Sequence, residues 1–166
     1  MTRRVLPPRE VALPRFHVRQ YRPSDHDTVW ELHTVALEAV GAHAGHGPFD
    51  DDLHHVEEVY LDAGGEFLVG ELDGEIVAMG ALKRLDDDRA EVTRMRVQPD
   101  CWRRGYGQMI LTRLEDRARE LGYTTLSLDT TTGQTAAQQL YEKNGYVEVN
   151  RGRSFGFEVI QYEKIL

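Results

Sequence analysis

Three consecutive β-strand patterns in the middle of the chain constrain its fold more than any other feature. Residues 66–72 and 75–85 are rich in apolar side chains and are separated only by Asp73-Gly74, a dipeptide typical of tight hairpins. Asp86-Asp87-Asp88 makes a second turn, and residues 90–97 follow as a third strand. We therefore expect an antiparallel meander at the centre of the molecule.

Helix and strand patterns flank this meander on both sides. Helices repeat apolar residues every three to four positions, whereas strands alternate them. On this basis we predict strands over 16–21, 124–131, 146–149 and 155–162, and helices over 29–40, 50–61, 107–121 and 135–143. The order β-α-α-β-β-β-α-β-α-β-β predicts an α/β (α+β) domain with a mixed central sheet and helices packed on its faces.

Two local signals predict where the first two helices begin. Ser24 follows Pro23 and is a candidate N-cap, because its hydroxyl can accept a hydrogen bond from a free backbone N–H. Asp50, Asp51 and Asp52 supply negative charge where the dipole of the second helix favours it.

The length and composition indicate one ordinary domain. Residues 1–14 contain three prolines and no periodicity, so we expect an extended arm followed by a single domain over residues 15–166. No apolar run approaches the roughly 20 residues of a membrane span, and no apolar signal segment follows the N-terminus. The single cysteine, Cys101, excludes an internal disulfide framework. We expect a cytoplasmic protein that does not associate with membranes.

The charge balance argues against nucleic acid as a partner. The chain has 28 acidic and 20 basic residues, a formal net charge of −8, whereas proteins that bind the phosphate backbone are usually basic. A local site for a small anion remains compatible with this balance.

Such a local anion site is predicted where the third strand of the meander leads into a helix. Gly105 and Gly107 allow a tight turn and a close approach to a ligand, and the helix that follows presents free N–H groups. Arg103 and Arg104 add donors suited to phosphate oxygens. The alternative is a plain strand–helix turn with exposed arginines. Ile110 stands where a Rossmann fingerprint needs a third glycine, so that motif does not fit.

Two segments carry a family resemblance. Residues 94–107 (RMRVQPDCWRRGYG) and 136–146 (AAQQLYEKNGY) resemble motifs A and B of the GCN5-related N-acetyltransferase (GNAT) superfamily. The predicted order of elements is similar to the GNAT fold from residue 16 to the C-terminus. Trp102 occupies a position where the family carries Gln or Arg, which leaves that phosphate contact to Arg103 or Arg104.

The resemblance implies acetyl-CoA as the co-substrate and a sheet that a bulge in the fourth strand helps to splay between strands four and five. The backbone of Met95 and Val97 would bind the pantetheine arm, and the amides of Arg103 to Gln108 would bind the pyrophosphate. The implied cofactor-binding residues are Met95, Arg96, Val97, Arg103, Arg104, Gly105, Tyr106, Gly107, Gln108 and Gln134. No metal is implied.

The resemblance also implies direct transfer of the acetyl group to a primary amine. Tyr141 would donate a proton to the departing sulfur, and Glu91 would take the proton of the amine. Asp129 is a second candidate base. The structural alternatives are helix packing for Tyr141 and a solvated strand end for Glu91. Cys101 lies in the phosphate loop and is interpreted as a bystander.

The acceptor is less defined. Residues 41–49 and the histidines at 43, 46, 54 and 55 predict a glycine-bearing lid rather than a zinc site. The acidic composition suits a cationic small-molecule amine. Two alternatives stay open, an acyl-CoA-binding sensor or regulatory module without catalysis and an acetyltransferase acting on protein N-termini or lysines. A homodimer is also possible.

Overall fold

Seven strands form one mixed sheet in the order β1-β2-β3-β4-β5-β7-β6. The computed structural model describes residues 15–42, 45 and 47–166, so the predicted arm over residues 1–14 lies outside the described residues. All neighbouring strands are antiparallel except the parallel pair β4–β5. The strands are β1 Phe16–Gln20, β2 Glu66–Leu72, β3 Glu75–Arg84, β4 Arg89–Val97, β5 Thr125–Thr131, β6 Val147–Ser154 and β7 Phe157–Ile165.

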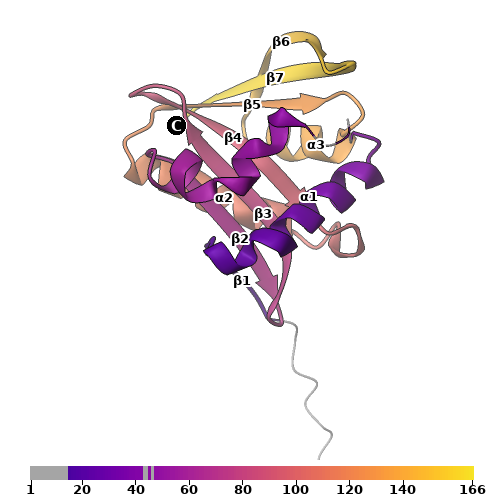
Figure 1. Cartoon of the computed structure of the whole chain (residues 1–166). Helices are drawn as coiled ribbons and strands as arrows, with labels where there is room; N and C mark the ends of the chain where they lie inside the picture. The colour runs from indigo at the N-terminus through magenta and orange to yellow at the C-terminus, as the bar shows by residue number, and fades with distance from the viewer. Residues whose placement is uncertain (1–14, 43–44, 46) are drawn as a thin grey trace, which may run out of the picture.

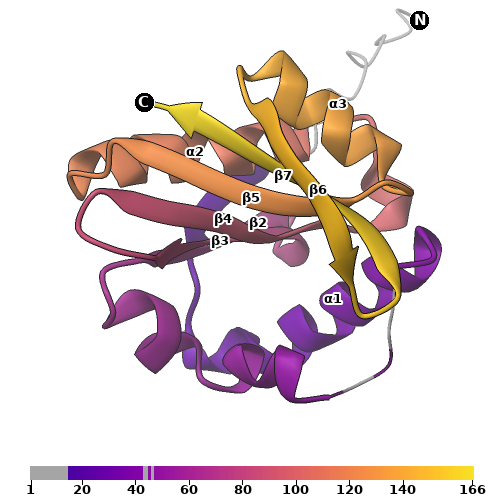
Figure 2. The same ribbon diagram turned by 90° about the horizontal axis from the view of Figure 1, so that it is seen from above.

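Helices cover both faces of this sheet, as predicted. The helix α1 (His26–Ala39) lies on one face, and α2 (Tyr106–Glu120) and α3 (Thr135–Lys143) lie on the other (Figure 1, Figure 2). Successive residues of β3 alternate between two cores, with Met79 in the core beneath α1 and Ala78 in the core beneath α2. Because side chains alternate across a strand, the continuous apolar run of β3 is explained by burial on both faces.

The region between α1 and β2 differs from the predicted single helix. It consists of a 3-10 segment, η2 (Pro48–His54), followed by a π-helical turn, η3 (Glu57–Leu61). The aspartates at its start therefore do more than place negative charge near a helix N-terminus. The carboxylates of Asp50 and Asp52 bond to Arg94 on β4, and these tertiary bonds fix a backbone path that helix propensity does not describe.

The start of α1 also differs from the prediction. Ser24 lies inside a short 3-10 turn, η1 (Pro23–Asp25), and is not the N-cap of α1. Asp25 occupies that position, but its carboxylate accepts hydrogen bonds from the Arg22 N–H and the Arg19 guanidinium instead of capping the helix. A side-chain ion pair has thus replaced the expected cap.

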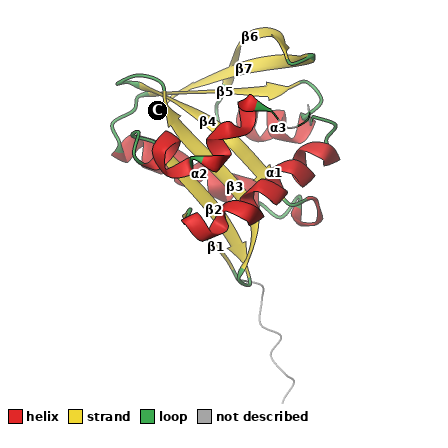
Figure 3. Ribbon diagram, viewed as in Figure 1, coloured by secondary structure: helices red, strands yellow, loops and turns green. Residues whose placement is uncertain are grey.

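The β6–β7 hairpin is longer than predicted and occupies one end of the sheet (Figure 3). Its two turn residues, Phe155 and Gly156, both have positive φ, as a type I′ turn requires. All eight residues of β6 are exposed, so the strand has no alternation of buried and exposed positions that its sequence could reveal. No helix in the described part of the chain is long and apolar enough to cross a membrane.

Candidate active site

The sheet opens between β4 and β5. The two strands pair only at Arg89↔Thr125, Ala90↔Leu126 and Glu91↔Ser127, and no further pair follows although both strands continue. The edge of β4 beyond Glu91 therefore faces β5 without a ladder to it. This confirms the predicted splay between the fourth and fifth strands.

A bulge in β4 accompanies the opening. Between Met79 and Ala81 the strand β3 advances by two residues, whereas the paired segment of β4 advances by three, from Thr93 to Arg96. Arg94 lies in this stretch with φ 57, in the left-handed region that favours glycine. The extra residue bends β4 just beyond its last pair with β5.

A buried network holds the bulge residue in place. The Arg94 guanidinium donates from Nε to Asp52 Oδ2 (2.9 Å), from Nη1 to Asp50 Oδ1 (3.2 Å) and from Nη2 to the Phe49 carbonyl (2.7 Å). The same oxygen, Asp50 Oδ1, also lies 3.0 Å from His33 Nε2, and the Tyr60 hydroxyl donates to Asp52. The network ties η2 to β4, and sequence patterns alone did not indicate it.

The ionisation of this network follows from its contacts. Burial by itself would raise the pKa of Asp52, but the hydrogen bonds and charge of Arg94 outweigh burial and hold that pKa below its usual range. Burial, together with the charges of Arg96 and Arg94, lowers the pKa of His33 to about 4. At neutral pH the Asp52 carboxyl is therefore ionised and the His33 imidazole is neutral.

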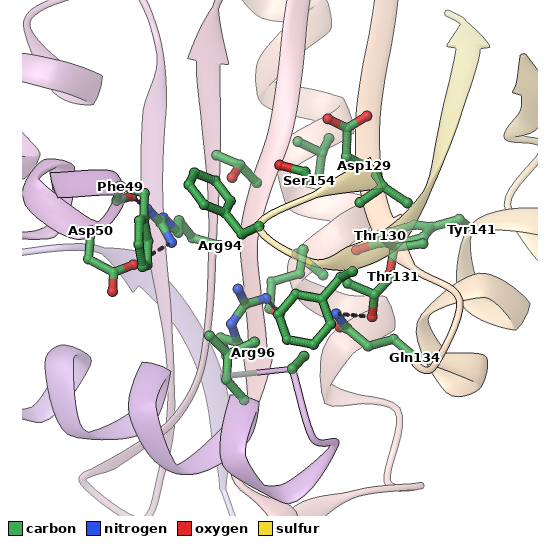
Figure 4. Close-up of a pocket in the computed structure, with 18 of the residues that line it drawn as sticks. Phe49, Asp50, Arg94, Arg96, Asp129, Thr130, Thr131, Gln134, Tyr141 and Ser154 are labelled. Carbon is green, nitrogen blue, oxygen red and sulfur yellow. Dashed lines mark hydrogen bonds and ion pairs between the residues drawn. The ribbon is translucent and has the colours of Figure 1, made fainter. Parts of the chain in front are cut away.

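A cavity of about 220 Å³ lies in the opening between the two strands. Figure 4 shows Arg94 and Arg96 on the β4 side, and Asp129, Thr130, Gln134 and Tyr141 on the opposite side. Phe49 from η2 and Phe155 from the β6–β7 turn also line it, and their ring centroids lie 4.8 Å apart. Two segments distant in sequence thus meet beside one cavity.

Tyr141, the predicted proton donor, lines this cavity. It comes from α3 and is only 5% exposed, and its ring contacts Tyr146 and Tyr162. Among the described residues, its hydroxyl makes no hydrogen bond. Burial raises the pKa of Tyr141 to about 12, against the opposing effect of the Arg96 charge. The phenol is therefore protonated at neutral pH.

The two candidate bases lie on the same face of the sheet. Glu91 is in the last β4–β5 pair and does not line the cavity, whereas Asp129, two residues beyond its partner Ser127, is exposed and lines it. Burial, and next the negative charge of Asp129, raise the pKa of Glu91. Burial also raises the pKa of Asp129. Both carboxylates thus hold a proton more tightly than in water.

Arg96 differs from Arg94 in having almost no partners. Its Nη1 donates to the carbonyl of the adjacent Met95 (2.7 Å), and its buried Nε has no hydrogen-bond partner in the described residues. Burial, and next the charge of Arg94, lower the pKa of Arg96 to about 10. The guanidinium is still charged at neutral pH, and its side chain lines the cavity.

The predicted phosphate loop joins β4 to α2. Gly105 precedes the first residue of α2 with φ 83, and Arg103 and Arg104 are exposed beside it. A Cβ on Gly107 would meet Leu140 at 3.6 Å and Val97 at 3.7 Å, which are ordinary contacts. The first N–H groups of α2 have no acceptors within the helix, as at any helix N-terminus, so the loop is suited to an anion.

The other predicted loop residues have structural contacts. The Gln108 side chain exchanges two hydrogen bonds with Asn144 of α3, and the Tyr106 ring stacks on Phe16 at 4.0 Å. Trp102 donates from Nε1 to the Val97 carbonyl (2.9 Å). Cys101 is buried outside the cavity lining. The side chains of Gln108 and Tyr106 are therefore engaged by Asn144 and Phe16.

The histidines do not gather around the cavity in the part of the chain that is described. His54 Nδ1 meets His26 Nε2 at 2.7 Å on the surface, and the predicted lid residues His43 and His46 lie outside the described residues. No group of three or more His, Cys, Asp or Glu side chains suited to a metal occurs among the described positions.

Comparisons with known proteins agree on one family. The acetyltransferase (GNAT) family model matches residues 21–146, well over half of the chain. An uncharacterized N-acetyltransferase of Escherichia coli, YedL, is 40% identical over 76 residues, which are 45% of this chain and 48% of that protein. The IAA acetyltransferase of Azospirillum brasilense is 36% identical over 83 residues, 49% and 54% of the two chains. The aligned part thus spans about half the length of these relatives.

Solved structures extend the likeness to nearly the whole chain. A GNAT-family acetyltransferase from Staphylococcus aureus has a TM-score of 0.83 at 20% identity and covers 91% of this chain and 99% of its own. The protein yncA from Salmonella typhimurium, solved with its cofactor acetyl-CoA, has a TM-score of 0.74 at 20% identity and covers 90% and 93%. The fold is therefore shared across this range. Together with the family match, it shows that the chain belongs to the GNAT acetyltransferase family.

Proposed function

We propose that this domain transfers the acetyl group of acetyl-CoA to the primary amine of a small molecule, by direct attack within a ternary complex. The observation that carries the proposal is the opening between β4 and β5, which begins where their pairing ends. It is lined by Asp129 and by Tyr141, a buried side chain whose hydroxyl has no hydrogen-bond partner among the described residues.

The residues around the opening fit acetyl-CoA. An open strand edge can bond to an extended chain as a further strand would, so the β4 backbone from Met95 to Val97 would hold the pantetheine arm. The amides of Arg103 to Gln108 would hold the pyrophosphate, with Arg103 and Arg104 as additional donors. Gln134 and the Arg96 backbone complete the predicted cofactor site, since both residues line the cavity that continues from this edge.

In the reaction the amine nitrogen forms a bond to the thioester carbon, and the carbon–sulfur bond breaks. A backbone N–H of the splayed β4 would polarise the carbonyl oxygen. Tyr141 would donate its proton toward the departing sulfur, so that CoA leaves as the thiol. Burial raises the pKa of Tyr141, and the same dry surroundings raise the pKa of a thiol, which helps the two groups to exchange a proton.

Glu91 is proposed as the base that accepts the surplus proton of the amine. Because Glu91 does not line the cavity, the proton would reach it through a water molecule near Asp129, which does. The negative charge of Asp129 raises the pKa of Glu91 and thereby strengthens it as a base.

The shape of the cavity supports a small acceptor rather than a protein segment. Phe49 and Phe155 approach each other beside it from two separate parts of the chain. Such a boundary leaves less room for a polypeptide than an open groove does. A sensor without catalysis would not require a tyrosine in the same cavity whose hydroxyl is unpaired within the described ranges.

An acceptor screen tests this function. The protein is incubated with acetyl-CoA and panels of small amines, aminoglycoside antibiotics and peptides, and the release of free thiol is measured against samples without acceptor. We expect thiol release that depends on a small amine, with the acetylated amine identified by mass. Thiol release with peptides alone would favour the protein-modifying alternative. Binding of acetyl-CoA with no transfer to any amine would favour the sensor.

A further inference from the structure

Arg96 is the one cation of the cavity lining that lacks an anion among the described residues. Arg94, two positions earlier on the same strand, is neutralised by Asp50 and Asp52. Arg96 donates only to the Met95 carbonyl, and its buried Nε has no partner in the described ranges. Isolated buried charges are expensive, so an unpaired guanidinium in a cavity is typical of a site that a ligand completes.

The charged groups around Arg96 do not supply this partner. Asp50 and Asp52 bond directly to Arg94 and attract Arg96 only at a distance. The positive charge of Arg94 repels that of Arg96. His33 is neutral at pH 7 because its pKa is about 4, and Tyr141 across the cavity is un-ionised. None of these groups bonds directly to Arg96, so its remaining donors are available to an incoming anion.

We propose that the acceptor is an anionic amine of the amino-acid class, an inference that rests on the proposed function. The carboxylate or phosphonate of this acceptor would bind Arg96, and its amine would face Asp129 and the thioester. A guanidinium presents paired N–H donors that match a carboxylate or a phosphonate. The ligand anion would take the place that Asp50 and Asp52 hold at Arg94.

The rest of the cavity wall indicates the kind of side chain. Phe49, Phe155 and Phe157 line the cavity together with Leu37, so an apolar group on the acceptor would find apolar surface there. The cavity is thus divided into a cationic part at Arg96, an acidic part at Asp129 and an aromatic part. An amino acid with an apolar side chain matches all three, which a simple amine does not.

Three probes that share one benzyl group and one primary amine separate the possible anions. L-phenylalanine carries a carboxylate, its 1-amino-2-phenylethylphosphonic acid analogue carries a phosphonate, and 2-phenylethylamine carries neither. We expect wild-type kcat/KM for at least one anionic probe to exceed that for 2-phenylethylamine by about 100-fold, the size expected of charge-assisted hydrogen bonds. The anionic probe with the larger kcat/KM relative to 2-phenylethylamine shows whether the site prefers a carboxylate or a phosphonate.

The substitution Arg96→Gln should reduce this ratio to near 1, and Arg96→Lys should restore part of it because the charge returns without the paired donors. Arg113→Gln is the matched control, since it removes an exposed arginine of α2 and should leave the ratio unchanged. The thermal midpoint of each variant verifies folding. Arg96→Gln should not lower that midpoint, because it removes an uncompensated cation.

The outcomes separate this inference from the proposed function. Acetylation of all three probes at similar rates, or a ratio that survives Arg96→Gln, would overturn the anionic acceptor and leave the acetyltransferase intact. If wild type acetylates neither these probes nor any amine of the acceptor panel, the proposed function fails, and calorimetric titration of L-phenylalanine and its phosphonate into the CoA complex decides the inference. Binding that Arg96→Gln abolishes supports it, and no binding refutes it.

Discussion

At the residue scale, the hydroxyl of Tyr141 offers the most direct test of the chemistry. Tyr141→Phe removes the proposed proton donor and keeps the ring that packs against Tyr146 and Tyr162. We expect kcat to fall about 100-fold or more, the usual contribution of a positioned acid, with little change in acetyl-CoA affinity. Steady-state thiol release and a binding titration measure the two effects.

A matched control is available next to it. Tyr162 is equally buried, and its hydroxyl bonds to Glu142 without lining the cavity. Tyr162→Phe should therefore change stability slightly and kcat very little. Equal losses in both variants would mean that Tyr141 acts through packing and not through its proton.

The two carboxylates give a prediction with a definite sign. A base must be ionised, so kcat/KM should rise with pH through the raised pKa of Glu91, and Glu91→Gln should erase this acidic limb. Asp129→Asn removes the negative charge that raises the pKa of Glu91, so the limb should move to lower pH. If Asp129→Asn erases the limb and Glu91→Gln only shifts it, the roles are reversed.

The same groups predict how stability depends on pH. Because the folded-state pKa of Glu91 is raised, its ionisation destabilises the fold, and its favourable contribution is lost as pH rises through that pKa. Glu91→Gln should therefore be more stable than wild type at neutral pH. The difference in unfolding free energy should vanish below pH about 4, where the carboxyl is protonated in both states.

At the element scale, the bulge in β4 depends on Arg94, and two substitutions separate its two properties. Arg94→Ala and Arg94→Gly both remove the guanidinium from Asp50 and Asp52, which should destabilise the fold by about 3 kcal/mol in a partly buried network. Glycine adopts the left-handed conformation at φ 57 without strain. We therefore expect Arg94→Gly to be more stable than Arg94→Ala by about 1 kcal/mol.

Chemical denaturation measures both values. If the alanine variant is at least as stable as the glycine variant, the backbone at Arg94 is not strained and the network alone explains the bulge. Thermal unfolding of Asp52→Asn provides a check, since it weakens the same ion pairs from the other side without changing the β4 backbone.

Elements with local signals could be predicted, and those fixed by tertiary bonds could not. The Asp73-Gly74 turn places β2 and β3 within one residue of the predicted strands, because the turn itself sets the register. In contrast, η2 follows the bonds of its aspartates to β4. The family resemblance implies a bulge in the fourth strand, but local sequence does not place it, because it is at an arginine rather than a glycine. Neither feature has a signal within its own segment.

The candidate site likewise contains residues that the sequence could predict and residues that only tertiary contacts bring together. Tyr141 and Gln134 line the cavity, and the family resemblance implies both as site residues. Phe155 lies more than a hundred residues from Phe49, so no local pattern brings them together. The unpaired state of Arg96 is equally invisible in the sequence, because it depends on which arginine the aspartates of η2 reach.

At the scale of the whole molecule, the net charge of −8 and the local cations at the phosphate loop act in opposite directions on acetyl-CoA. At physiological ionic strength charges farther than about 8 Å are largely screened, so the exposed Arg103 and Arg104 should dominate close to the loop. We expect the KM for acetyl-CoA of the wild type to rise with salt.

The double variant Arg103→Gln/Arg104→Gln should start from a KM that is roughly tenfold higher at low salt, as expected from losing two charge-assisted phosphate contacts. Its KM should change less with salt, so that the two curves converge at high ionic strength. Arg113→Gln/Arg119→Gln removes the same two charges from the exposed face of α2 and should follow the wild-type curve. If both double variants raise KM equally, net charge rather than the loop controls binding, because only the loop arginines can contact the pyrophosphate directly.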